Sequence, residues 1–342
     1  MKKLNVTLLF LGLGFLGYLV WRVGPGVLWQ QVAELGWGII PLILSEGAAN
    51  LAHTLGWRNC LQKTHSCVPL SRLFRMAMAG FAINYLLPTA SVGGEASRAA
   101  LLAANGPVPA AISSVLLDKL STAIAHLALA LLGVVFVLYY AQLPSEVWIA
   151  MAISTLLLAA GMAGFLLMQR HGKLGAVLRW LTDRQLGGAL ALQATRHVSE
   201  VDEALKQFYR ERPLDFALSI GWHTLGHSAA IFQAWLFLWL IHHPATLPQV
   251  ACAGCFALWC DLLTFAIPLN LGALEGSRIL SLKAIGNSAP VGMAFGVSVR
   301  ITQVFWACFG LISYAFLTVR KANGLTATSV ATVPTQTEPR AS

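Results

Sequence analysis

The sequence contains little charge for its length. Asp, Glu, Lys and Arg make up 11% of its 342 residues, hydrophobic residues make up 57%, and the mean hydropathy is +0.68. A soluble domain buries a core without needing apolar runs of about 20 residues, which is the length of a helix that crosses a bilayer. Such runs recur along the whole chain. The composition therefore excludes a soluble globular protein and predicts an all-α integral membrane protein.

The chain also lacks the residue patterns of a cofactor, metal or nucleotide site, and no cofactor is expected. One C-x-x-C pair, Cys252 and Cys255, has no His or Cys partner at metal-binding spacing and is interpreted as a pair of small packing residues. The net charge of +9 does not indicate nucleic acid, because the basic residues flank the apolar segments. Membrane phospholipids are the expected partners.

Apolar runs and loop charges together predict the topology. The basic loops 58–75 and 169–213 are expected on the cytoplasmic side, whereas 141–146 and 242–249 contain no Lys or Arg and are expected outside. Both termini are then cytoplasmic. Full spans are predicted at about residues 4–21, 36–57, 110–140, 147–168, 214–241 and 291–319.

Two shorter apolar segments do not fit as further spans. The chain must cross the membrane an odd number of times between loops 58–75 and 141–146, and again between loop 242–249 and the cytoplasmic carboxyl end, yet each of these stretches contains two apolar segments. In each stretch one segment is a full span, and the other, 74–106 or 250–288, must enter and turn back. These two segments are therefore predicted to be re-entrant hairpins, and they enter from opposite sides. With six full spans, this divides the chain into a first membrane repeat, 1–141, and an inverted second repeat, 142–321. The polar residues 322–342 are expected to form a disordered tail.

An internal sequence repeat supports this division. Residues 88–98 recur 180 residues later as 268–278, with four residue types in identical register. The shared residues are Pro88, Glu95, Ser97 and Arg98 in the first copy and Pro268, Glu275, Ser277 and Arg278 in the second. Gly93 and Gly94 let the backbone turn and approach a ligand closely. Inverted repeats with broken helices are the architecture of secondary transporters, so the pattern favours translocation.

The repeated charged residues are the first candidates for function, because charge beside apolar stretches is unfavourable without a role. Arg98 and Arg278 could each bind a phosphate through a bidentate guanidinium, with Glu95 and Glu275 positioning them. Alternatively, each Glu and Arg form an i,i+3 pair that only caps the limb of the hairpin.

Further charged residues interrupt the apolar spans. Asp118, Lys119 and Arg300 follow the two hairpins at similar depth, which suggests a cavity lining. Asp118 is expected to pair with Arg300 or Arg98. Lys119 either faces this cavity or extends to the cytoplasmic surface. Asp261 is a candidate proton carrier.

Polar stripes occur on two of the predicted spans. Glu46, Asn50 and His53 share one helix face, and His223 and His227 share another. Because no third metal ligand accompanies the His pair, polar packing or headgroup contact is favoured over zinc binding. Glu46 is a second candidate proton carrier, and nothing in the sequence fixes the coupling.

The basic loop contains two stretches with helical apolar spacing, 174–181 and 198–208. Both are predicted to form amphipathic helices on the inner leaflet. They either contact anionic lipid or belong to a solvated loop that only orients the protein.

Together, these motifs resemble the transmembrane region of the lysylphosphatidylglycerol synthase family, whose members are also called flippase-like domain proteins. The resemblance extends from about residue 4 to residue 320. The motif residues are Asn84, Pro88, Gly93, Gly94, Glu95, Arg98, Asp118, Lys119, Pro268, Gly272 and Glu275. Around Leu86 and Gly93 the chain also resembles members related to hopanoid gene clusters.

The resemblance implies a function in lipid transport. In two-part members, a soluble domain attaches an amino acid to phosphatidylglycerol and the membrane region moves the product to the outer leaflet. The chain is therefore expected to be a lipid flippase of the bacterial inner membrane, not an enzyme, supplied by a separate lipid-synthesis enzyme. Asp118 and Lys119 stand where many relatives carry Glu-Arg, which leaves the preferred headgroup open.

Two alternatives to transport stay open. A membrane enzyme could use Glu95 or Asp118 as a general base on a lipid-linked substrate. A non-transporting scaffold could instead hold a lipid-synthesis complex together.

Overall fold

The structure, a computed structural model, contains only helices among the residues that it describes, which confirms the all-α class for this part of the chain. These residues are 24–86, 92–140, 145–171, 198–264 and 270–330, together with residues 18, 21, 173 and 176. The α-helices are α2 Pro25–Leu35, α3 Ile39–Asn59, α4 Leu70–Leu86, α5 Val92–Ala103, α6 Val108–Tyr140, α7 Ser145–Arg170, α10 Val198–Glu211, α11 Pro213–Leu240, α12 Leu247–Thr264, α13 Ala273–Lys283 and α14 Ala289–Val330. Short 3₁₀ helices cover Gly36–Gly38 and Lys63–His65.

Several expectations fall outside the described residues. Both repeated prolines, Pro88 and Pro268, lie there, as does nearly all of the first apolar run at 4–21. The first amphipathic stretch of the basic loop, 174–181, is also outside, apart from residue 176.

Within the described residues, five helices are long and apolar enough to cross a membrane. They are Ala33–Asn59, Val108–Val137, Met151–Arg170, Leu247–Thr264 and Ala289–Thr318. Four of them coincide with predicted full spans, and the fifth is the first limb of the segment predicted as the second hairpin. The other predicted span within the described residues, 214–241, is occupied by α11, which is 28 residues long and is not among these five.

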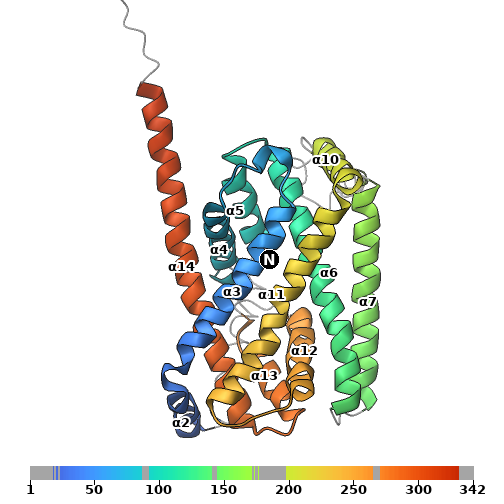
Figure 1. The fold of residues 1–342 in the computed structure, drawn as a ribbon, viewed down its shortest axis with the longest axis vertical. Helices are drawn as coiled ribbons and strands as arrows, with labels where there is room; N and C mark the ends of the chain where they lie inside the picture. Colours follow the sequence, from blue (N-terminus) through green and yellow to red (C-terminus); the bar gives the residue numbers. More distant parts are fainter. Residues whose placement is uncertain are drawn as a thin grey trace, which may run out of the picture.

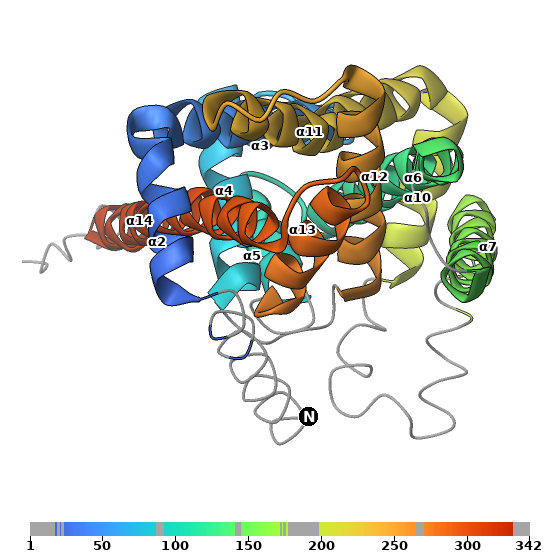
Figure 2. The ribbon, with the colours of Figure 1, turned by 90° about the horizontal axis from the view of Figure 1, so that it is seen from below.

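The helices differ in how far they extend along the molecule. In Figure 1, α3, α6, α7, α11 and α14 run along most of its length, whereas α4 and α5 lie in the upper half and α12 and α13 in the lower half. Seen from below, α3 and α11 lie side by side as one layer, and α7 stands at an edge (Figure 2). The shorter helices pack against the long ones, with α4 on α14, α12 on α6 and α13 on α14.

The two larger clusters of buried apolar side chains in the described residues hold most of these elements together. One joins α11, α12, α13 and α14, and it includes Phe237 and Phe295, whose ring centroids are 5.1 Å apart. The other joins α3, α4, α5, α6 and α10, with Trp57 and Phe208 fully buried. Burial of such side chains contributes about 1.5–3 kcal/mol each in water-soluble cores; within a bilayer, close packing replaces that driving force.

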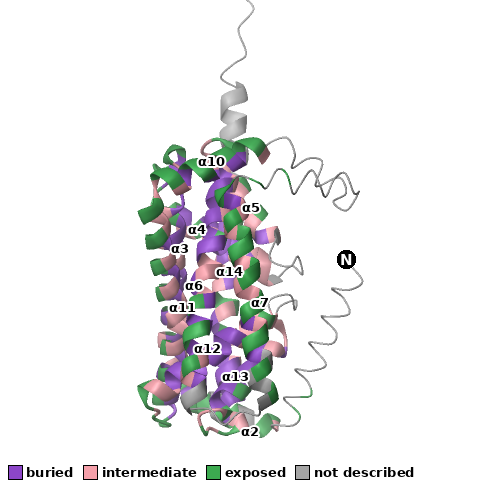
Figure 3. Ribbon diagram, turned by 90° about the vertical axis from the view of Figure 1, so that its right-hand side faces the viewer, coloured by how far each residue is buried: buried purple, intermediate pink, exposed green. Residues whose placement is uncertain are grey.

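The outer surface carries many large apolar side chains, and charged and polar side chains lie in the interior beside the apolar clusters. Large exposed hydrophobic residues include Leu156 and Leu157 of α7, at 71% and 67% exposure, and Phe316 of α14. Figure 3 shows the exposed residues along the outer faces of the helices and the buried ones between them. This distribution suits a surface in contact with lipid tails.

Two helices occupy segments that were predicted to be part of the basic loop and of the carboxyl-terminal tail. The second amphipathic stretch forms α10, whose apolar residues Val201, Leu205 and Phe208 are buried against α6 and α7. At the carboxyl end, α14 continues to Val330 and so includes residues 322–330 of the predicted tail.

Candidate functional site

Four charged residues from α5 and α6 form the first polar site, here called the Arg98 cluster: Glu95, Arg98, Asp118 and Lys119. Arg98 donates hydrogen bonds from Nη1 to Glu95 Oε2 at 2.9 Å and from Nη2 to Asp118 Oδ2 at 2.6 Å. Lys119 Nζ lies 3.2 Å from Glu95 Oε1. The guanidinium carbon of Arg98 lies 3.9 Å from the ring centroid of Trp57 on α3. Two carboxylates and an aromatic face therefore hold this guanidinium.

A second site, the Arg278 cluster, consists of Asp261, Glu275, Arg278 and Arg300. Arg278 on α13 binds both oxygens of Asp261 on α12, at 3.1 and 2.8 Å. Arg300 on α14 donates to Glu275 Oε1 through Nε and to Oε2 through Nη2, the latter at 3.0 Å. Its Nη1 also donates to the hydroxyl of Tyr85 on α4 at 3.2 Å. This cluster joins α12, α13, α14 and α4.

Backbone contacts fix the start of the helix that carries each Glu. Gly94 N–H donates to Asn84 Oδ1 at 2.7 Å, and a Cβ on Gly94 would lie 2.2 Å from the carbonyl oxygen of Gly80. The backbones of α4 and α5 therefore touch at this point. At the other site, Gly272 has a φ of 72°, and its N–H donates to Glu275 Oε2 at 3.0 Å. A side chain is disfavoured at that φ, which explains the glycine.

The i,i+3 pair expected in both copies is formed in one. Glu95 and Arg98 are paired, whereas Arg278 is bound to Asp261, a residue that the sequence suggested only as a proton carrier. Glu275 instead accepts hydrogen bonds from Arg300 of the following helix and from the backbone N–H of Gly272 at the start of α13. The i,i+3 pair of Glu and Arg therefore accounts for the first copy of the motif only, whereas in the second copy Glu275 caps α13 and Arg278 binds another helix.

The partners of the remaining candidates follow from this arrangement. Of the two partners expected for Asp118, the structure has Arg98, and Arg300 belongs to the other cluster. Lys119 turns towards Glu95 and its side chain is 52% exposed, so it lies at an open edge of the cluster. Gly93 occupies the first turn of α5, next to this edge.

Each cluster combines two carboxylates with two basic side chains and has no formal net charge. In the Arg98 cluster, exposure falls from 52% for Lys119 to 4% for Asp118. Pairing allows these charges to lie among apolar helices, because an unpaired charge there is strongly unfavourable. Lys119 has the most exposed side chain of this cluster, and both terminal nitrogens of Arg98 are bound to carboxylates.

Four histidines lie beside the Arg98 cluster: His53, His126, His223 and His227. His126, which lies on α6, was not singled out from the sequence. Asp118, Thr122 and His126 follow one another at i,i+4 spacing, a signal that could have found it. His223 Nε2 lies 3.0 Å from Asp118 Oδ1. Among the described residues, no group of three or more His, Cys, Asp or Glu could hold a metal ion.

A groove of about 850 Å³ lies between α4, α5 and α14. Arg72 and Arg75 of α4 line it together with apolar side chains of α14, among them Phe309, Ile312 and Phe316. Both arginines are exposed, and neither forms an ion pair with a carboxylate of the described residues. The groove therefore combines a cationic end with an apolar wall.

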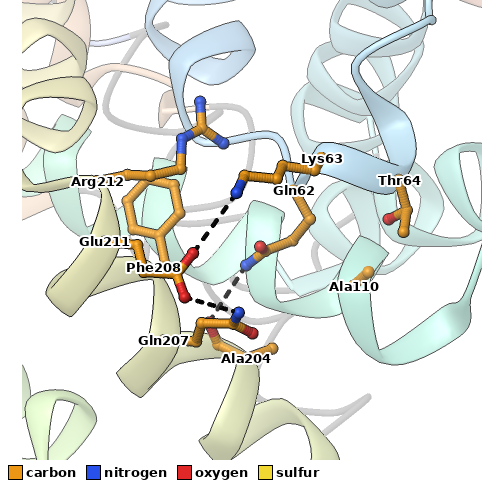
Figure 4. Close-up of a pocket in the computed structure, with 9 residues that line it drawn as sticks. All are labelled: Gln62, Lys63, Thr64, Ala110, Ala204, Gln207, Phe208, Glu211 and Arg212. Carbon is orange, nitrogen blue, oxygen red and sulfur yellow. Dashed lines mark hydrogen bonds and ion pairs between the residues drawn. The ribbon is translucent and has the colours of Figure 1, made fainter.

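A smaller cavity of about 300 Å³ lies under α10 (Figure 4). Lys63 Nζ is 3.6 Å from Glu211 Oε2, and Gln207 donates to Glu211 Oε1 at 2.9 Å. The hydrogen bond from Gln207, together with nearby Lys63, holds the pKa of Glu211 below its usual value. Gln62 donates to the carbonyl of Ala204 at 3.3 Å. These contacts hold α10 against the connection between α3 and α4 and involve neither cluster.

An apolar helical bundle with paired charges in its interior defines an integral membrane protein with an internal polar site. The sequence model of the family described as lysylphosphatidylglycerol synthase TM region matches residues 5–311. The chain therefore belongs to this family, and the resemblance predicted from the motifs is confirmed. No curated protein and no solved structure matches the chain.

Proposed function

We propose that this protein moves a phospholipid or a related polar lipid between the leaflets of a bacterial inner membrane, without chemistry of its own. The observation that carries the proposal is the pair of neutral ionic clusters inside a bundle with an apolar exterior. A polar headgroup needs such an interior, because crossing the hydrocarbon layer without polar partners is unfavourable. Membership of a lipid-related membrane family is consistent with this function.

The proposed architecture is an inverted repeat in which α4–α5 and α12–α13 are re-entrant hairpins. Three observations support it. The two helix pairs lie in opposite halves of the molecule (Figure 1). Each second limb carries the repeated Glu and Arg. In both copies this Glu pairs with a base of the following long helix, Glu95 with Lys119 and Glu275 with Arg300.

The sidedness proposed for the membrane places both termini in the cytoplasm. Exposed basic residues gather around the start of α4 and the end of α10, among them Arg58, Lys63, Arg72 and Arg210. The opposite end of α11 is followed by a loop, 242–249, without Lys or Arg. This asymmetry is the one expected between cytoplasmic and external loops.

The groove beside α14 is the access route that we propose for the lipid. Its cationic end, Arg72 and Arg75, suits the phosphate of a headgroup in the cytoplasmic leaflet, and its apolar wall suits an acyl chain. A separate enzyme would synthesise the lipid and release it into this leaflet. From the groove, the headgroup would move to the Arg98 cluster while the tails stay in the bilayer.

At the cluster, we propose exchange of partners rather than binding to free charges. The half-exposed Lys119 contacts the headgroup first, and the phosphate then replaces Asp118 or Glu95 at the Arg98 guanidinium. Because a phosphate oxygen can accept the N–H bond that the departing carboxylate oxygen gives up, the exchange conserves hydrogen bonds. The same exchange at Arg278 would release the lipid towards the other leaflet.

A reconstitution experiment tests the proposed function. The purified protein is placed in liposomes with headgroup-labelled phosphatidylglycerol or phosphatidylcholine, and the label accessible to an impermeant quencher is followed over time. We expect exchange at least about tenfold faster than in protein-free liposomes, lost in the Arg98→Gln/Arg278→Gln variant. The control is Arg58→Gln/Arg210→Gln, which removes the same charge from exposed positions.

The outcomes separate the three functional classes. Unchanged exchange in a folded Arg98→Gln/Arg278→Gln variant would show that the clusters are not the lipid site. A lipid product of altered mass after incubation with a lipid extract would support the membrane enzyme. Absence of exchange for every headgroup, together with recovery of a stable complex with a synthesis enzyme, would support the scaffold.

A further inference from the structure

Four buried or half-buried histidines lie next to one another beside the Arg98 cluster and are here called the histidine path: His53, His126, His223 and His227. They come from α3, α6 and α11, which pack against one another. The series begins at Asp118, whose Oδ1 lies 3.0 Å from His223 Nε2. His223 Nδ1 in turn lies 2.8 Å from His53 Nδ1. One imidazole donates and the other accepts in this contact.

The series continues through ring contacts to the opposite side. The ring centroid of His53 lies 4.7 Å from that of His227, and the ring centroid of His227 lies 4.6 Å from that of His126. His126 Nε2 donates to the carbonyl oxygen of Leu258 on α12 at 2.8 Å. The path therefore leads from α5 and α6 across α3 and α11 to α12.

The path ends near the second cluster. Asp261, the partner of Arg278, follows Leu258 by three residues on α12, which is less than one turn of the helix. The charged groups that act on the four rings from the surrounding helices are Asp118 of α6, Arg98 of α5 and Asp261 of α12. A carboxylate therefore stands at each end of the path, and each carboxylate is also bound to the arginine of a cluster.

The path lies deep within the bundle rather than at its surface. His223 follows the start of α11 by about 15 Å along the helix axis, and His227 follows it by about 6 Å more, at about 1.5 Å per residue. Within the described residues, the histidines do not form a metal site. His227 Nε2 is buried and has no hydrogen-bond partner there. A packing role alone would leave this nitrogen desolvated without compensation.

We propose that the histidine path transfers protons between the Arg98 cluster and the Arg278 cluster. Hydrogen bonds join Asp118 to His223 and His223 to His53, whereas His53, His227 and His126 meet through ring contacts. Rotation of the imidazoles would bring ring nitrogens of these neighbours together, so that each ring takes a proton on one nitrogen and releases one from the other. Asp118 and Asp261 give or take the proton at the two ends. No oxidant, reductant or metal takes part. Chains of Asp, Glu and His serve this purpose in membrane pumps and transporters.

The proposal deepens the proposed function, on which its last step rests. A proton on Asp118 removes the negative partner of Arg98 and leaves the guanidinium available to a phosphate. A proton on Asp261 does the same at Arg278. Movement of the proton along the path would thereby release one arginine from its carboxylate while the other arginine regains its ion pair. A proton gradient would then drive lipid exchange in one direction.

Proton flux into liposomes loaded with a pH-sensitive dye tests the path. An imposed pH gradient is applied to wild type, to His227→Gln and to the control His171→Gln, which changes an exposed histidine at the end of α7. Glutamine keeps a hydrogen-bonding side chain but cannot relay a proton. We expect His227→Gln to lose at least about nine-tenths of the flux and the control to keep it. His53→Gln, at a second position of the path, should behave as His227→Gln does.

Lipid exchange is measured in the same liposomes, with and without the gradient, so that the two proposals fail separately. Exchange accelerated by the gradient in wild type but not in His227→Gln supports both. Proton flux that is equal in wild type, His227→Gln and protein-free liposomes overturns the path, even if lipid exchange persists. Flux that His227→Gln abolishes, in a protein that exchanges no lipid, overturns lipid translocation and leaves the path standing.

Discussion

Arg98 is held by contacts of three kinds, and each has a different energetic weight. Its pair with Asp118 is the most buried, its pair with Glu95 is partly open, and the Trp57 ring contributes a cation–π contact. Removing one partner of a buried ion pair leaves a charge without compensation, which costs about 3–5 kcal/mol, whereas exposed pairs contribute about 0–1 kcal/mol. The burial of each ion pair therefore determines how much its loss lowers the free energy of unfolding.

Asp118→Asn should destabilise the protein by about 3 kcal/mol, because Arg98 loses its buried carboxylate and His223 loses an anionic partner. Reversible denaturation in mixed micelles measures the free energy of unfolding. Asp215→Asn is the matched control, since Asp215 pairs with Arg212 at a more exposed position, and a loss below about 1 kcal/mol is expected there. Equal losses for the two variants would contradict the weight given to burial.

Lys119→Gln should affect transport more than stability. The ammonium group is 52% exposed, so its pair with Glu95 adds below about 1 kcal/mol to folding. As the proposed first contact of an anionic headgroup, its loss should slow exchange of labelled phosphatidylglycerol about tenfold and that of phosphatidylcholine less. The ratio of the two exchange rates is the measured quantity. If the variant slowed the exchange of both lipids equally, Lys119 would have no role in headgroup recognition.

At the scale of helices, α4 and α5 approach each other closely because small residues face one another. The carbonyl of Gly80 lies where a Cβ of Gly94 would be, and Asn84 binds the N–H of Gly94. This contact sets the position of α5 and with it that of Glu95 and Arg98. Small residues at such crossings are a common means of packing helices within membranes.

Gly94→Ala should therefore destabilise the protein by about 1–3 kcal/mol, because the added methyl group meets backbone that cannot move aside. Gly161→Ala on α7 is the control. No atom lies within 4 Å of the added Cβ there, and alanine favours a helix by up to about 1 kcal/mol over glycine. The free energy of unfolding of both variants decides the point. A neutral Gly94→Ala would mean that α4 and α5 can separate at no cost.

The elements also differ in how far the sequence could predict them. The apolar spacing of residues 198–208 is local, and it predicted α10, but not that α10 packs on α6 and α7. Charged residues within apolar runs can be recognised from the sequence alone, so the repeated motif identified Glu275 and Arg278. The pairing of Arg278 with Asp261 could not be predicted in this way, because it depends on which faces α12 and α13 turn to each other.

For the whole molecule, the arrangement of the two clusters has a consequence that neither has alone. They share no ion-pair partner among the described residues: Arg98 is bound to Glu95 and Asp118, and Arg278 to Asp261. The two clusters therefore contribute separately to the free energy of unfolding. Transport by exchange of conformation between two halves instead requires both, because a lipid that enters through one cluster must leave through the other.

This difference predicts opposite results for stability and transport in one double-mutant cycle of Arg98→Gln and Arg278→Gln. The two losses in unfolding free energy should add to within about 0.5 kcal/mol, as they do for sites without shared partners. Exchange of labelled phosphatidylglycerol should be nearly abolished by either single variant, so that the double variant is no slower than the singles. Independent, additive effects on the exchange rate would mean that each cluster serves a separate route, and the alternating use of one central site would be wrong.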